Sequence, residues 1–166
     1  MFKINDVVNY STTGLCNIVS VEKREVAGSQ KEFFVLKPII DDKATVMVPT
    51  DNELLISRMY NPLSKNEADL FVAGLPDILP FWVEDDRLRN EEYKKVLISG
   101  ERERIAAVIK ALYIHQSHQS QKGRKLRSMD ERFLRDAERL LCGELSYVLG
   151  KESKEISQLV LNSIKE

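Results

Sequence analysis

The sequence predicts an α+β protein, with a small antiparallel β-barrel or sheet over residues 1–60 and an all-helical domain over residues 61–166. Three observations lead to this prediction. The first part consists of short stretches rich in β-branched residues, separated by tight turns. From about residue 64, the spacing of the apolar residues changes from two to 3.6. The 166 residues, of which 43% are hydrophobic and 31% charged, are enough for one medium or two small globular domains.

Four short strands are expected in the first part, each rich in apolar or β-branched residues. They cover residues 6–10, 15–22, 31–39 and 44–48. Turn-forming residues separate them at 11–14, 27–29 and 41–43. Gly14 can adopt a positive φ in the first turn. Pro49 ends the last strand, because it has no amide hydrogen to donate to a ladder.

The second part predicts a series of helices, and the boundary between the two parts falls in residues 58–64. Ser64 with Glu67 three residues later has the form of a capping box, which begins a short helix that ends near Gly74. Proline residues then interrupt the pattern. Further helices are expected over residues 86–98, over 101–116, from 128 onward and over 151–164.

A second capping box, Ser128 with Glu131, is expected to begin the helix that starts at residue 128. The residues before it, 116–127, are polar and include Gly123. We expect them to form a loop or a frayed helix end.

Charge is distributed unevenly along the chain, although the formal net charge is only -1. Residues 99–166 carry 13 basic and 10 acidic side chains, whereas residues 61–98 carry 5 and 8. Residues 105–129 contain no acidic residue, five Lys or Arg residues and both histidines. A run of this kind is either a solvated loop or a surface that faces phosphate groups, and the sequence leaves both interpretations open.

The sequence lacks the motifs of common catalytic sites, so we expect a protein that is not an enzyme. It has no glycine-rich phosphate loop, no His-Glu-x-x-His and no Gly-x-Ser-x-Gly motif. Cys16 and Cys142 are expected in the core. His115 and His118 could share a metal ion, but no Asp, Glu or Cys lies within ten residues to complete a site. We expect no cofactor and no metal ion.

Two further features bear on localisation and on charge. The acidic residues 84–86 could bind a divalent cation, but the sequence favours a role as the charge complement of the following helix N-terminus.

No stretch approaches the roughly 18 apolar residues of a membrane span, and the first residues lack the apolar core of a signal peptide. We expect a cytoplasmic protein.

Five blocks of sequence carry a resemblance to a known family. They are residues 2–10 with the following Thr13 and Gly14, residues 28–37, 46–49, 93–101 and 134–150. In this order, they resemble the first strand and glycine turn, the central hairpin, the closing strand and the two main helical blocks of the CarD/CdnL family of bacterial transcription regulators. The resemblance covers nearly the whole chain.

The resemblance implies a Tudor-like or SH3-like barrel that docks on the β subunit of RNA polymerase, as in the transcription-repair coupling factor. Arg24 falls where the family places a polymerase-contacting arginine. An exposed strand can also pair with a strand of a partner through backbone hydrogen bonds. That strand is expected to contribute Val46, Met47, Val48 and Pro49. Met47 replaces an arginine of some members, so a contact there is apolar or absent.

The resemblance further implies that the helical domain contacts promoter DNA at the upstream edge of the transcription bubble and stabilises the open complex. Trp82, the only tryptophan, lies near the family's tryptophan that wedges against bases in the minor groove. In some members basic residues follow that tryptophan at once, whereas here the acidic residues 84–86 intervene. A tryptophan buried between the two domains is the alternative.

The expected phosphate contacts are basic residues, which would bind DNA largely independently of sequence. They are Arg87, Arg89, Lys94, His115, Lys122, Arg124, Lys125 and Arg132, with Lys95 and Arg127 close by. The alternative function is a protein-only polymerase adaptor, whose helical domain binds another protein, and the acidic residues of 61–98 keep it open. No heptad seam is present, so a monomer is expected.

Overall fold

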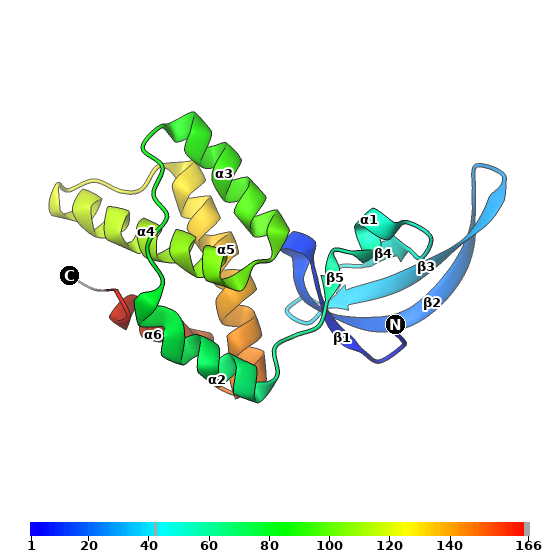
Figure 1. Cartoon of the computed structure of the whole chain (residues 1–166). Coiled ribbons are helices and arrows are strands. Elements are labelled where there is room, and N and C mark those ends of the chain that lie inside the picture. The colour runs from blue at the N-terminus through cyan, green and yellow to red at the C-terminus, as the bar shows by residue number, and fades with distance from the viewer. Residues whose placement is uncertain (42, 165–166) are drawn as a thin grey trace. The chain divides into compact units, whose positions relative to one another are not determined.

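The computed structural model describes residues 1–41 and 43–164 and forms two compact units, Met1–Pro62 and a second unit that begins at Leu63. The first unit is an antiparallel sheet with two short helical segments (Figure 1). Its elements are β1 (Val7–Tyr10), η1 (Ser11–Thr13), β2 (Gly14–Val26), β3 (Ser29–Pro38), β4 (Val46–Pro49), α1 (Glu53–Ile56) and β5 (Met59–Tyr60).

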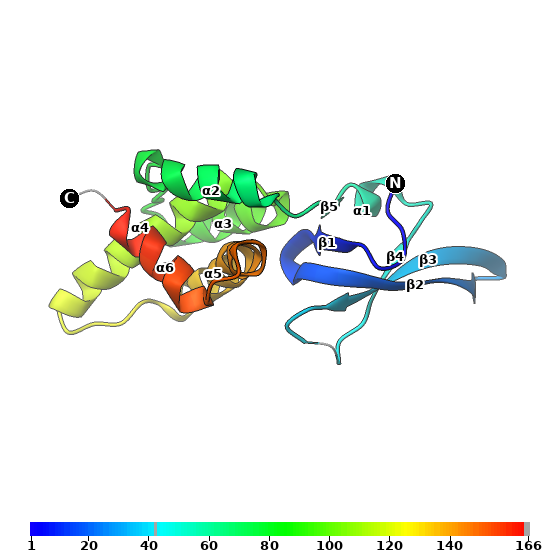
Figure 2. The same cartoon turned by 90° about the horizontal axis from the view of Figure 1, so that it is seen from below.

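The five strands pair in the order β4-β3-β2-β1-β5, all antiparallel. No pairing among the described residues joins β4 to β5, so the sheet is open and the predicted barrel closure is not confirmed. The long β2–β3 hairpin extends beyond β4 (Figure 2). Its tip is a two-residue turn in which Ala27 has φ 51° and Gly28 has φ 81°, the combination that a tight hairpin turn requires.

One face of the sheet buries a small apolar core. The core consists of Val8, Cys16, Ile18, Leu36, Val48 and Met59. Cys16 is fully buried in this core, so the prediction that it is a core residue is confirmed. This burial raises the pKa of its thiol to about 11. The predicted turn over residues 41–43 includes Asp42, which lies outside the described residues. The sequence did not predict α1 or β5, because both are only a few residues long.

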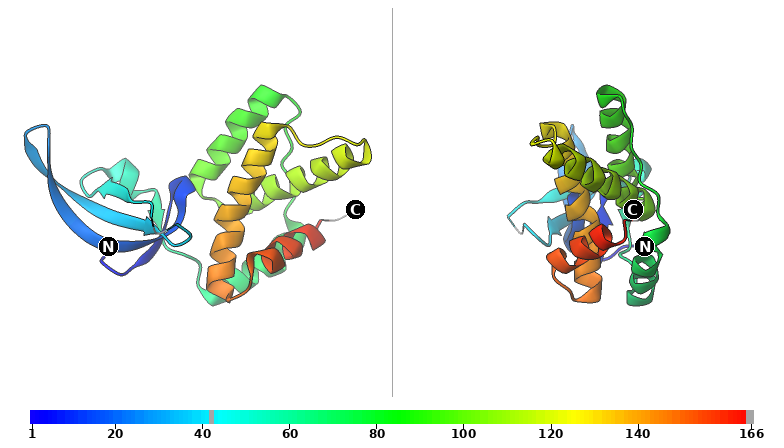
Figure 3. Two further views of the ribbon diagram at one scale, coloured as in Figure 1. Left: turned by 180° about the vertical axis from the view of Figure 1, so that it is seen from behind. Right: turned by 90° about the vertical axis from the view of Figure 1, so that its left-hand side faces the viewer.

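The second unit is entirely helical. It contains α2 (Lys65–Gly74), η2 (Leu75–Asp77), α3 (Asp86–Ser99), α4 (Arg102–Gln121), α5 (Ser128–Leu149) and α6 (Ser153–Asn162). Helix α5 contacts α2, α3, α4 and α6 and is the centre of the packing (Figure 3). Helix α5 has an apolar face that is buried, formed by Phe133, Leu134, Ala137, Leu140 and Leu141. None of the described helices has the length and hydropathy needed to cross a membrane.

Helix ends follow the sequence signals in two cases and depart from them in two others. The Ser64 hydroxyl accepts the backbone N–H of Glu67 at 3.1 Å, and the Glu67 carboxylate accepts that of Ser64 at 3.1 Å, so the first capping box is confirmed. Gly100, with φ 70°, ends α3. The second capping box is wrong: α5 begins at Ser128 after Arg127, without a side-chain cap.

Helix α4 also continues beyond its predicted end. Residues 116–121 are helical, so the predicted loop shrinks to residues 122–127. We call residues 122–127 the basic loop.

Two buried charged groups tie distant parts of the helical unit together. The Lys110 ammonium donates to the backbone carbonyls of Leu75, Ile78 and Ser163, the last two at 2.9 and 3.4 Å. The Glu144 carboxylate accepts two hydrogen bonds of 2.7 Å from the guanidinium of Arg102 and one of 2.9 Å from the backbone N–H of Leu63. These contacts fix where the chain enters and leaves the unit.

Candidate functional site

Trp82 lies in the segment between η2 and α3. The residue before it is hydrogen-bonded through its backbone to both α4 and α3. The backbone N–H of Phe81 donates to the carbonyl of Ala107 at 3.0 Å. The hydroxyl of Tyr93, a buried residue of α3, donates to the carbonyl of Phe81 at 2.6 Å. The path of the chain into Trp82 is therefore fixed by hydrogen bonds to two helices.

Trp82 is partly buried and packs against the helical core. Its indole stacks on the imidazole of His115, with ring centroids 4.2 Å apart and an interplanar angle of 29°. Its Nε1–H donates to the carboxylate of Glu84 at 2.8 Å. The indole also lines a surface pocket with Pro80, Ile114 and both histidines. Trp82 is thus anchored by its neighbours without being enclosed by them.

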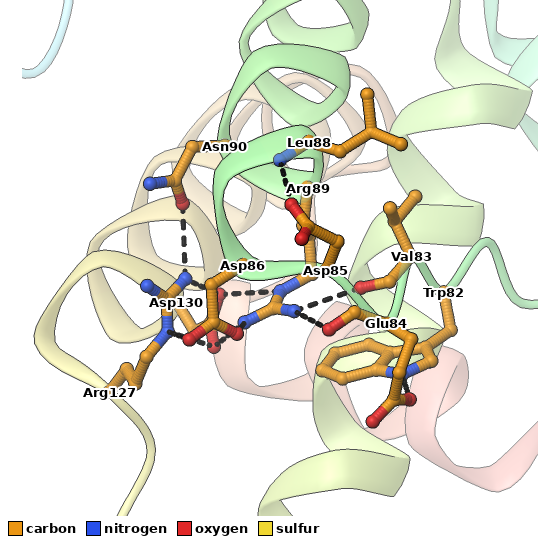
Figure 4. Close-up of polar contacts among 10 residues, drawn as sticks. All are labelled: Trp82, Val83, Glu84, Asp85, Asp86, Leu88, Arg89, Asn90, Arg127 and Asp130. Atoms are coloured by element: carbon orange, nitrogen blue, oxygen red, sulfur yellow. Dashed lines mark hydrogen bonds and ion pairs between the residues drawn. The ribbon is translucent and has the colours of Figure 1, made fainter.

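Arg89 lies beneath this surface, and its prediction as a phosphate contact is wrong. The residue is only 1% exposed. Its guanidinium makes a two-pronged contact with the carboxylate of Asp130, at 2.9 and 2.8 Å (Figure 4). It also donates to the carboxylate of Asp86 at 2.8 Å, and to the carbonyls of Val83 and Glu84 at 2.8 and 3.3 Å. These contacts engage all five N–H donors of an arginine, which leaves none for DNA.

The Arg89 guanidinium lies against Trp82, with its central carbon 4.4 Å from the centre of the indole ring. This distance is that of a cation–π contact. The side chain that the sequence predicted to contact phosphate is instead buried and packs against Trp82.

Asp130 is fully buried at the start of α5 and is shared by two arginines. Besides Arg89, it accepts hydrogen bonds of 3.2 and 3.1 Å from Arg127, the last residue of the basic loop. Arg127 also donates to the side chain of Asn90 in α3 at 3.1 Å. Burial opposes the charged form of Asp130, but the hydrogen bonds from both arginines outweigh it and lower its pKa. The carboxylate therefore stays ionised in the interior.

The acidic residues 84–86 have specific partners within the helical unit. The Asp85 carboxylate caps α3 by accepting the backbone N–H of Leu88 at 2.8 Å, and Asp86 lies in the first turn. The predicted role at the helix N-terminus is therefore confirmed for these two residues, whereas Glu84 binds the indole of Trp82. Asp86 also binds Arg89, as described above. In the part of the chain that the structure describes, no group of three or more His, Cys, Asp or Glu residues could hold a metal ion.

The other predicted phosphate contacts are exposed cations. Arg87 has a side chain that is 92% exposed and lies 3.9 Å from Glu91. The predicted contacts Lys94 of α3, Arg132 of α5, and Lys122, Arg124 and Lys125 of the basic loop are also exposed. His115 differs, because burial lowers the pKa of its imidazole, which is also stacked on Trp82. The basic loop is fixed at its end by Arg127 and by the buried side chain of Leu126.

The residues predicted to contact polymerase lie in two places on the sheet. Strand β4 is an edge strand, and the side chain of its Val48 is fully buried. A partner could therefore contact Val48 only through its backbone. Met47 is partly buried. Arg24 lies on β2 opposite Lys31, beyond the end of β4, and pairs with Glu22 at 3.0 Å. Its side chain is 58% exposed.

The sequence analysis missed the roles of Asp130, Arg127 and Asn90. The spacing of three residues between Arg127 and Asp130, and between Asp86 and Arg89, is that of helix ion pairs. This spacing was the available signal, but it does not reveal that the two pairs meet across α3 and α5.

Comparison with known families matches both units. Residues 2–60 match the CarD-like/TRCF RID domain, and residues 84–161 match the CarD C-terminal domain. Trp82 lies just before the second matched segment. The two domains occur in the order and at the positions that the sheet and the helices occupy. The chain therefore belongs to the CarD-like family of RNA polymerase-interacting transcription factors.

Proposed function

We propose that this protein is a non-enzymatic monomer that docks on the β subunit of RNA polymerase with a Tudor-like sheet domain. With its helical unit, it contacts promoter DNA at the upstream edge of the bubble and stabilises the open complex. One observation carries the DNA part of the proposal. Trp82, stacked on His115, and the basic loop share one buried network at the start of α3 and α5. An aromatic side chain beside cations is suited to unstacked DNA.

The polymerase part rests on the sheet. The edge strand β4 and the exposed Arg24 are the features that support it. An edge strand supplies backbone hydrogen bonds to a partner strand without any change of fold. Arg24 adds a charge that favours an acidic contact on the partner.

The expected DNA contacts are Trp82, His115 and the exposed cations of α3, α5 and the basic loop. Such contacts bind phosphate and distorted base steps without reading base edges. The acidic residues of 61–98 kept the protein-only adaptor open. Two of them have partners within the helical unit, because Asp86 binds Arg89 and Glu84 binds Trp82. The charge of Asp86 is therefore offset by arginines beside the proposed DNA surface, whereas the indole N–H orients the Glu84 carboxylate without neutralising it.

The lifetime of polymerase open complexes on promoter DNA, with and without this protein, tests the proposal. We expect the protein to lengthen the lifetime and to bind DNA on its own with a strong dependence on salt. If the protein binds polymerase but leaves the lifetime and the DNA unaffected, the adaptor function is correct instead.

A further inference from the structure

We propose that Asp130 is a positioning residue that holds Trp82 and the basic loop in one fixed arrangement. This inference rests on the proposed function, because it concerns how the DNA-contacting groups of that function are presented. Asp130 itself is fully buried and has no access to DNA.

The first step concerns the orientation of Arg89. The carboxylate of Asp130 holds the guanidinium from α5, and the carboxylate of Asp86 holds it from α3. Each of the remaining donors contacts a backbone carbonyl in the segment that follows Trp82. A planar guanidinium with all its donors engaged has a single orientation, and this orientation places it 4.4 Å from the centre of the indole ring.

The second step connects Arg89 to the polar edge of the indole. Glu84 accepts a hydrogen bond from Arg89 through its backbone carbonyl, and accepts the indole N–H through its side chain. Arg89 thus supports Trp82 in two ways: directly, by packing against the indole ring, and indirectly, through Glu84. Figure 4 shows that the contacts of Val83, the Glu84 backbone, Asp86 and Asp130 converge on the Arg89 guanidinium, while the Glu84 side chain reaches the indole.

The third step concerns the basic loop. Arg127, at the end of the loop, binds the same two carboxylate oxygens of Asp130 as Arg89 does. The exposed cations Arg124 and Lys125 precede it by three and two residues. One carboxylate therefore fixes both the end of the loop and the support of the tryptophan.

Stability alone gives a weak reason to keep such a cluster. Buried ion pairs can often be replaced by well-packed apolar side chains without loss of stability, whereas removing one partner is costly. A network that spans α3, α5 and the segment after Trp82 does provide geometry that apolar side chains would not. We infer that geometry is its role.

Trp82 is the only tryptophan, so fluorescence excited at wavelengths that the five tyrosines do not absorb reports on this side chain alone. The test variant is Asp130→Asn, which keeps the shape and removes the charge. Glu144→Gln is the matched control. Glu144 is also a buried carboxylate of α5 that binds an arginine with two hydrogen bonds, but it lies 14 residues further along the helix, about 21 Å away.

We expect Asp130→Asn to increase acrylamide quenching of Trp82 and to lower its fluorescence anisotropy in the free, folded protein. Glu144→Gln should leave both unchanged, even where it lowers the unfolding midpoint as much. All proteins are measured well below their midpoints. If Asp130→Asn does not fold, Arg89→Lys is measured instead, because it keeps the charge and loses the two-pronged contact. Unchanged quenching in the folded test variant, or an equal rise in the control, would overturn the proposal.

Promoter DNA separates this proposal from the proposed function. Asp130→Asn should weaken DNA association roughly tenfold, a loss of about 1.4 kcal/mol. If Trp82 loosens while neither this variant nor Trp82→Ala affects DNA association or open-complex lifetime, the positioning role stands and the proposed function fails. If DNA association falls without any loosening of Trp82, the positioning role fails and the proposed function stands.

Discussion

The two units of the chain differ in what they bury. The core of the sheet is apolar, and its charged side chains lie at the surface. The helical unit buries four charged residues, Arg89, Lys110, Asp130 and Glu144. A sheet presents recognition groups through the backbone of its edge, whereas a helical bundle has no free backbone along its helices and must present side chains. The difference teaches that the proposed recognition by side chains requires support from within the unit, and Arg89 and Asp130 supply it for Trp82.

The largest expected effect tests whether the helical unit depends on its buried charges. Lys110→Met removes the donor shared by three backbone carbonyls and should lower the free energy of unfolding by about 3 kcal/mol, because buried acceptors lose their partner. Lys37→Met, on an exposed position of β3, should change it by less than about 0.5 kcal/mol. Denaturant unfolding followed by circular dichroism measures both. Equal effects would remove the distinction between the units.

The next effect concerns recognition by the sheet. Arg24→Glu should weaken binding to a polymerase β-subunit fragment by at least ~1 kcal/mol, because a charge that meets a partner acid is reversed. The stability of the sheet should not change, since Arg24 is exposed. Titration calorimetry with the full-length protein measures the affinity, and Lys23→Glu on the same strand is the control. Unchanged affinity would exclude Arg24 from the contact.

A smaller and different effect is expected from the basic loop. Replacing Lys122, Arg124 and Lys125 together by Gln should weaken DNA association evenly across sequences. The dependence of log K on log salt should become less steep by about 0.9 for each lost phosphate contact. Arg127 is left in place because it anchors the loop. A triple variant with the wild-type salt slope would mean that the loop is only a solvated connector.

The smallest effect is a pH dependence from His115. Burial lowers the pKa of His115, so in the window between this lowered value and the ordinary value of about 6.5 the unfolded chain binds more protons than the native state. Stability should therefore fall as the pH decreases through that window. Thermal midpoints at about pH 7.5 and about pH 5.5 measure the fall. His115→Gln should reduce the fall; an equal fall in this variant would assign it to other groups.

The sequence was informative wherever a local pattern determines the structure. The capping box at Ser64, the glycine end of α3 at Gly100 and the apolar face of α5 are all set by residues within a few positions of one another. Local signals of this kind located all five helices α2–α6 and four of the five strands, although α4 proved longer than predicted.

The sequence was misleading where a partner distant in the sequence determines whether a side chain is buried or exposed. Arg89 has the charge and the position of a surface residue, and only Asp130, 41 residues away in the sequence, explains its burial. Composition and spacing do not encode such a meeting of two helices.

Trp82 provides the most direct test of the account, which holds that a fixed aromatic side chain of the helical unit stabilises the open complex. The measurement is the half-life of open complexes on promoter DNA with wild-type protein, with Trp82→Ala and with Leu79→Ala. Leu79 is the control, because it is 81% exposed three residues before Trp82 and is also apolar. We predict that wild-type protein and the Leu79 variant lengthen the half-life equally, whereas folded Trp82→Ala does not. A folded Trp82→Ala variant that lengthens the half-life as much as wild type would contradict the account.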